Sequence, residues 1–222
     1  MEYLIIALVT FGSLTYVMSF MTAAKLGYDC VADIAEGKKS SYPVSYFVAL
    51  RMQLAIVSIS SAIMGDMLMA ITRGAVLVPV SYSLAAFKDD DGHLTWADRE
   101  VRVSTYFMAA TFAVGVLMIQ VWTYAYVPSV IKSIAGVIGV ASVIYYFFAG
   151  QVPTIRQKWT EYKQQGKRPP GALMQIARAT GFGSFATANA LAGNWAVVGM
   201  NAIPLVGALT LLAMYATWSN KK

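Results

Sequence analysis

Residues 44–87 read VSYFVALRMQLAIVSISSAIMGDMLMAITRGAVLVPVSYSLAAF, and this stretch decides how the chain is organised. A helix needs roughly 20 apolar residues to cross the ~30 Å hydrocarbon core of a bilayer, so the stretch has the length of two crossings. Its charged residues are Arg51, Asp66 and Arg73. Because Gly65 and Asp66 lie near its middle, we predict two helices that turn there.

Further apolar blocks cover residues 3–24, 104–126, 130–150 and 181–218. The last block is again too long for one crossing, and Gly199, Asn201 and Pro204 predict a turn within it. The whole chain is 58% hydrophobic and 13% charged, whereas soluble domains are about a quarter charged. We therefore predict an all-α, polytopic integral membrane helix bundle that forms one domain over residues 1–222.

Three polar segments separate these blocks. Residues 27–41 predict a short polar loop, and residues 88–103 an acidic and polar cytoplasmic loop. Residues 151–180 predict a basic cytoplasmic loop that contains an amphipathic helix starting at Pro153. That helix could lie on the membrane surface or be a solvated linker.

Lysine and arginine predict the orientation, because short cytoplasmic loops are enriched in both residues. They gather in residues 25–39, 88–102, 151–180 and at the C-terminus. This distribution predicts about seven transmembrane helices, with the N-terminus outside and the C-terminus cytoplasmic, in an inner or plasma membrane. The alternative is six, with residues 52–72 as one helix and residues 74–87 as a re-entrant or interfacial piece.

Arg51, Asp66 and Arg73 are the candidate functional charges. A charge in a lipid-facing segment costs roughly 2.5–3.5 kcal/mol, so such residues usually face the bundle interior or a wet cavity. They could form an ion or proton pathway, or an Asp–Arg pair that fixes the helix register. Alternatively, Asp66 is a solvated turn residue and both arginines extend to the membrane interfaces.

The last apolar block carries small and polar residues at helical spacing. Small residues four apart let helix backbones approach closely, whereas asparagines could line a pore. The candidates for packing or pore lining are Ser184, Ala188, Asn189, Ala192 and Asn194.

Residues 89–98 are similar to part of an EF-hand calcium loop. With Gly92 as the invariant glycine, Asp89 and Asp91 fall at the third and fifth ligand positions. Phe87 stands where the first aspartate belongs, so an acidic turn before a helix is the alternative. With one histidine and one cysteine in the chain, we expect no cofactor.

These features favour a channel or transporter for an ion or small solute, and no enzyme. The alternatives are a structural, assembly or anchor subunit of a larger membrane complex of the secretion or phage type, and a lesion-forming pore. We expect the partners to be the lipid bilayer and further copies of the chain or another membrane protein. We expect no nucleic acid, because the basic residues flank the apolar blocks.

Overall fold

The computed structural model describes residues 2–37, 42–86, 127–166 and 172–219, and every element within them is helical. In chain order these elements are α1 (Glu2–Ala35), α2 (Val44–Met64), α3 (Met67–Ala86), α5 (Ser129–Tyr146), the π-helical turn η2 (Phe147–Gln151), α6 (Val152–Gln165), α7 (Ala172–Leu191) and α8 (Trp195–Ser219). The predicted helical fold is confirmed for this part of the chain. The predicted acidic loop, with Asp89 and Asp91, and the apolar block 104–126 lie outside the described residues.

Three helical segments of the described ranges are long and apolar enough to cross a bilayer. They are Ser45–Met64, Ser129–Gln164 and Trp195–Trp218. Large apolar side chains such as Leu14, Val137 and Leu209 are at least half exposed on the outside of the bundle. Soluble proteins rarely expose so much apolar surface, so lipid is the solvent that this surface fits.

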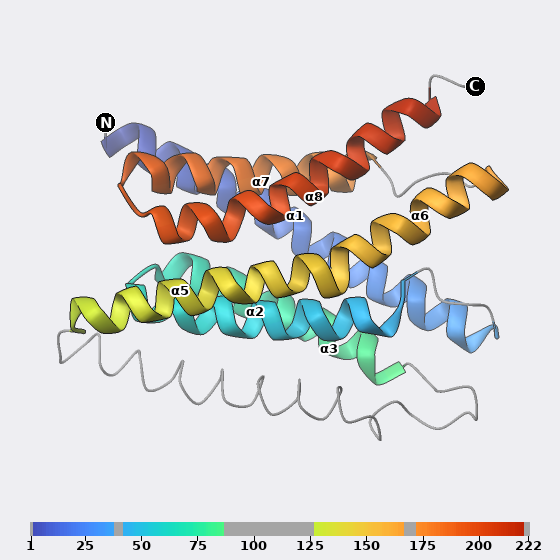
Figure 1. The fold of residues 1–222 in the computed structure, drawn as a ribbon, viewed down its shortest axis with the longest axis horizontal. Helices are drawn as coiled ribbons and strands as arrows, with labels where there is room; N and C mark the ends of the chain where they lie inside the picture. Colours follow the sequence, from blue (N-terminus) through green and yellow to red (C-terminus); the bar gives the residue numbers. More distant parts are fainter. Residues whose placement is uncertain (1, 38–41, 87–126, 167–171, 220–222) are drawn as a thin grey trace.

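The six long helices of the described residues form a closed ring, in which α5, η2 and α6 count as one (Figure 1). α3 packs against both α1 and α2, and α8 packs against both α5 and α7. The two triplets join where α1 packs against α7 and where α2 packs against α5. In Figure 1, α1, α3, α5 and α8 run in one direction, and α2 and α7 return. Thus α5, α7 and α8 occupy in the second triplet the places of α1, α2 and α3 in the first.

The turns within the two triplets have the same structure. Gly65 follows α2 with a φ of 90°, and Gly193 follows α7 with a φ of 74°. The next residue in each turn, Asp66 or Asn194, donates its N–H to the carbonyl five residues earlier, at 2.9 and 2.8 Å. This bond around a left-handed glycine is a common way to end a helix. The predicted turn at Gly65 and Asp66 is confirmed.

α1 and α5 share a second local feature. Thr15 donates a hydrogen bond to the carbonyl of Gly12 at 2.8 Å, and Ser142 donates one to the carbonyl of Gly139 at 2.7 Å. A Cβ atom on Gly12 would press against α7, and one on Gly139 would press against Met200 of α8 and then against Ser60 of α2. The shared turns and the shared packing order indicate that an approximate twofold axis relates the triplets.

The prediction for the second turn was wrong. Gly199, Asn201 and Pro204 lie inside α8, and α7 begins at Ala172 instead of residue 181. The chain turns at Gly193 because this glycine adopts the positive φ that the turn requires. Pro204 removes a single backbone hydrogen bond from α8, which continues to Ser219.

Two further predicted boundaries were wrong. α1 continues to Ala35, beyond the predicted end of the first apolar block, and Lys25 and Asp29 form an i,i+4 ion pair of 3.8 Å on its surface. The predicted segment 151–180 contains the expected helix, α6, with Pro153 in its first turn, and its last residues, from Ala172, already belong to α7.

α5, η2 and α6 form one continuous rod, which runs through the predicted end of the apolar block at Gly150. η2 directly precedes the first turn of α6, and its wider spacing of hydrogen bonds accommodates Pro153, which has no N–H. The 36 residues Ser129–Gln164 span about 54 Å at 1.5 Å per residue. This length favours an α6 that projects beyond the bilayer over one that lies on its surface.

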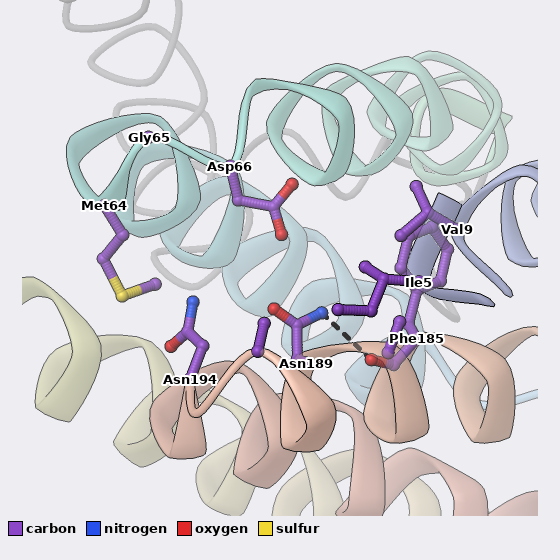
Figure 2. Close-up of a pocket in the computed structure, with 10 residues that line it drawn as sticks. Ile5, Val9, Met64, Gly65, Asp66, Phe185, Asn189 and Asn194 are labelled. Carbon is purple, nitrogen blue, oxygen red and sulfur yellow. Dashed lines mark hydrogen bonds between the residues drawn. The ribbon is translucent and has the colours of Figure 1, made fainter. Parts of the chain in front are cut away.

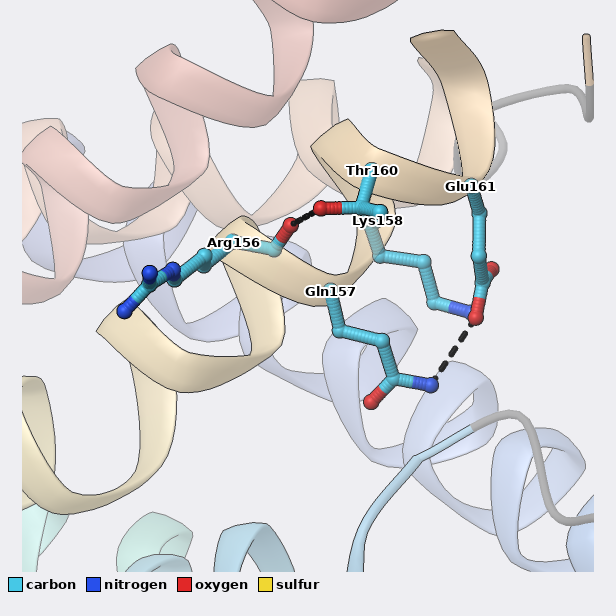
Figure 3. A network of polar contacts seen from close by, with 5 residues as sticks. All are labelled: Arg156, Gln157, Lys158, Thr160 and Glu161. Carbon is cyan, nitrogen blue, oxygen red and sulfur yellow. Dashed lines mark hydrogen bonds and ion pairs between the residues drawn. The ribbon is translucent and has the colours of Figure 1, made fainter. Parts of the chain in front are cut away.

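The polar side chains of α6 pair with one another along the helix (Figure 3). Glu161 accepts hydrogen bonds from Gln157 at 2.9 Å and from Lys158 at 3.0 Å, and Thr160 donates to the carbonyl of Arg156 at 3.0 Å. Such pairs contribute a few tenths of a kcal/mol each to a helix in water. They therefore stabilise α6 locally.

Candidate functional site

A cavity of about 300 Å³ lies at the end of the bundle where the two matching turns meet. Figure 2 shows the Asp66 carboxylate pointing into it from the α2–α3 turn, opposite Asn189 of α7. Of the residues predicted for packing or pore lining, Ala188, Asn189, Ala192 and Asn194 line this cavity. The fifth, Ser184, is buried where α7 packs on α1.

Asp66 caps α3 and faces the cavity. Its Oδ1 atom accepts a hydrogen bond from the N–H of Met69 at 3.0 Å, as an N-cap residue does. Burial raises the pKa of the Asp66 carboxyl above its ordinary value, and the Met69 N–H and the positive charge of Arg73 oppose this shift only in part. Asp66 is thus a turn residue, but a half-buried one that lines a cavity.

Arg73 and Asn201 form a buried polar pair in the ring interior. Arg73 Nη2 donates a hydrogen bond to Asn201 Oδ1 at 3.0 Å, and the two residues are 3% and 0% exposed. Asn201 Nδ2 donates to the carbonyl of Val197 at 2.8 Å, which fixes the orientation of the amide. The pair joins α3 of the first triplet to α8 of the second.

The two residues of this pair occupy equivalent positions in the triplets. Arg73 and Asn201 are 128 residues apart, and the same interval separates Gly65 from Gly193 and Asp66 from Asn194. The guanidinium and the amide therefore meet close to the approximate twofold axis. A solute bound at this place could contact side chains of both triplets.

Two phenylalanines of α7 connect the cavity to this pair. Phe185 lines the cavity, and Phe182, one turn away, packs with it in a buried apolar cluster. The guanidinium carbon of Arg73 lies 5.0 Å from the centroid of the Phe182 ring, and that of Arg178 lies 5.9 Å from it. Both are within the range of cation–π attraction.

On the side of Phe182 away from the cavity, four residues narrow the bundle interior. We call them the tyrosine–arginine cluster: Tyr42, Tyr46, Tyr146 and Arg178. The Tyr146 hydroxyl donates a hydrogen bond to the Tyr46 hydroxyl at 3.3 Å, and the Arg178 guanidinium interacts with all three tyrosines. The gap beside the cluster holds about 10 Å³, the lower limit for one water molecule. Within the described residues, the interior thus has a cavity at one end and only a narrow gap at the other.

The structure places the three predicted charges differently. Asp66, at the N-cap of α3, and Arg73, on α3, lie within electrostatic reach of each other. Arg51 lies on α2, 14 residues before Gly65 and so about 20 Å along that helix, and is 0% exposed. The alternative in which both arginines extend to the membrane interfaces is wrong, because both are buried.

Sequence reasoning missed Asn201 and Arg178. Asn201 was assigned to a turn because glycine and proline flank it, and Arg178 to a basic loop because of the charges before it. The available signal was the repeated Gly-Asp and Gly-Asn pair, since Asn201 follows Gly193 at the interval by which Arg73 follows Gly65.

No family model matches the chain, and no curated protein matches it. A solved structure of a eukaryotic SWEET transporter does match, with a TM-score of 0.51 and 14% sequence identity over 94% of this chain and 99% of that one. SWEETs are built from parallel repeats related by an axis along the membrane normal, which agrees with the two triplets. The chain is therefore a membrane-embedded helix bundle whose fold is like that of a SWEET transporter.

Proposed function

We propose that this protein is a transporter that moves a small polar solute across a membrane, between its two helix triplets and without a chemical step. The observation that carries the proposal is the Arg73–Asn201 pair at the junction of the triplets. Phe185 of the cavity wall packs on Phe182, which contacts Arg73 of the pair, and the tyrosine–arginine cluster leaves only a narrow gap on the other side. Transporters with internal repeats commonly place their sites near the bilayer midplane where the repeats meet.

Flux into liposomes tests this proposal. Purified protein reconstituted at a known orientation should give saturable uptake of at least one small polar solute above protein-free liposomes. Inert liposomes together with a co-purifying membrane protein would favour a structural subunit instead. Unselective collapse of an imposed membrane potential would favour a lesion-forming pore.

Seven spans, with the N-terminus outside and the C-terminus cytoplasmic, fit this proposal. If α1 and α5 cross in the same direction, the three helices of the first triplet require one more crossing before α5. Residues 104–126 are an apolar block of the necessary length. The cavity would then open to the outside, and the basic end of α6 would face the cytoplasm.

Single cysteines test this orientation. In a Cys30→Ser background, Leu191→Cys marks the cavity end of the bundle and Glu36→Cys the opposite end, and both positions are exposed. An impermeant maleimide should label Leu191→Cys in intact cells, and Glu36→Cys only after permeabilisation. The reverse pattern would invert the proposed topology.

A further inference from the structure

We infer that the cavity takes a small solute with a primary ammonium group, an amine or an amino acid, held by Asp66 and Asn189. The inference rests on the proposed transport function in that it names the substrate class of the same site. Its evidence is the charge, the hydrogen-bonding groups and the apolar wall of the cavity.

Asp66 is the one ionisable residue among the ten described residues that line the cavity. The two helix ends at each turn contribute opposite partial charges, because a C-terminus meets an N-terminus there. The nearest N-terminus, that of α3, is already capped by Asp66. The carboxylate therefore dominates the electrostatic potential of the cavity and favours a cation.

The polar groups of the cavity offer acceptors to a ligand. Asn189 Nδ2 donates to the backbone carbonyl of Phe185 at 2.9 Å, so the Asn189 Oδ1 atom faces the other way. Figure 2 shows this oxygen and the Asp66 carboxylate on facing sides of the cavity. An ammonium group has three donors and no acceptor, and it matches such a set of oxygens.

The remaining wall suits a hydrocarbon group of modest size. Ile5 and Val9 of α1 line the cavity together with Phe185 and Ala188 of α7, and Val9 packs against Phe185. A volume of about 300 Å³ is at the lower end for small-molecule sites. An anion would meet the carboxylate at close range, and a neutral solute would desolvate it without charge compensation. Both are therefore disfavoured.

Arg73 decides between the two sources of the ammonium group. Arg73 follows Asp66 by two helical turns, and its guanidinium lies 5.0 Å from the centroid of the Phe182 ring. Phe182 packs on Phe185, which lines the cavity, so Arg73 lies behind this part of the cavity wall. An amine would use Asp66 alone. An amino acid would also direct its carboxylate towards Arg73.

Four compounds with the same branched hydrocarbon group test the inference: leucine, isoamylamine, isoamyl alcohol and isocaproate. The measurement is the thermal stabilisation of the full-length protein in detergent, since a ligand that binds only the folded state raises its melting temperature. We expect leucine or isoamylamine to stabilise the protein at millimolar concentration, and the alcohol and the acid to have no effect. Stabilisation by isoamylamine would show that the ammonium group is sufficient for binding. Stabilisation by leucine but not by isoamylamine would show that the carboxylate is also needed, with Arg73 as its partner.

The Asp66→Asn variant should weaken binding of the stabilising compound at least about tenfold, because charge-assisted hydrogen bonds contribute roughly 1.5–3 kcal/mol. Asparagine caps helices as well as aspartate does, and Asn194 already occupies the equivalent turn, so the variant should fold. The double variant Asp66→Asn/Asn194→Asp returns a carboxylate to the same cavity and should recover part of the affinity. Asp29→Asn, an exposed site on α1, is the matched control.

Equal stabilisation by the alcohol or the acid, no stabilisation by either ammonium compound, or binding unchanged in Asp66→Asn would overturn the inference. This readout is binding, so it separates the inference from the proposed function. Flux of other solutes without binding of an ammonium compound would overturn the inference but support the proposed transport function. Binding of an ammonium compound without flux of any solute would support the inferred ligand but contradict the transport function.

Discussion

Replacing Arg73 with asparagine should lower solute flux into proteoliposomes by about tenfold or more. The variant removes the Arg73 guanidinium. This group donates a hydrogen bond to Asn201 Oδ1 at 3.0 Å and lies over the Phe182 ring. A buried polar group that loses a charged partner forfeits roughly 1.5–3 kcal/mol, which corresponds to this factor. The measurement is the initial rate of uptake at equal amounts of folded, monodisperse protein.

The approximate symmetry supplies the control for this variant. Asn201→Arg alone places two guanidinium groups against each other and should be destabilised, whereas Arg73→Asn/Asn201→Arg restores the pair with the helices exchanged. We expect the double variant to recover part of the flux. Full recovery is not expected, because Leu54 stands where a second Phe182 would be needed. A folded Arg73→Asn variant with normal flux would show that the pair is structural only.

Replacing Arg178 with alanine should open the sealed end of the bundle. Arg178 lies among Tyr42, just before α2, Tyr46 of α2 and Tyr146 of α5, and only about 10 Å³ remains empty beside it. The Arg178 guanidinium, next to the Phe182 ring, stands between the cavity end and the tyrosine end of the bundle. The alanine variant removes this barrier. We expect a several-fold rise in passive leak of small ions through liposomes that contain the variant, measured as decay of an imposed potential.

Arg156→Ala is the matched control for this leak, because Arg156 is exposed on α6 and lies outside the tyrosine–arginine cluster. Its liposomes should be as tight as those of the unmodified protein. A tight Arg178→Ala variant that still transports would contradict the role of the cluster as a seal. Equal leak in both variants would point to a general effect of lost positive charge.

Composition and the lengths of the apolar blocks were sufficient to predict a helical membrane protein. They were also sufficient for the α2–α3 hairpin, because residues 44–87 are too long for one crossing and contain one Gly-Asp pair. These features depend on neighbouring residues and on the thickness of a bilayer. They can be evaluated without knowing which helices touch.

The position of the second turn depended on the tertiary structure. Gly193 with Asn194, and Gly199 with Asn201 and Pro204, are both plausible turns by local rules. Asn201 can stay inside α8 because Arg73, 128 residues earlier, satisfies its buried amide oxygen. Arg178 looked like a loop residue because its partners, Tyr42, Tyr46 and Tyr146, lie far from it in sequence.

The sequence by itself determined that the protein is embedded in lipid, and it determined the hairpin that carries Asp66 and Arg73. Only the tertiary structure decided that the chain contains two equivalent triplets, and that Arg73 meets Asn201 between them. The physical reason is that hydrophobic length is a local property. The partner of a buried charge is set by which helices pack together, and that depends on the whole ring.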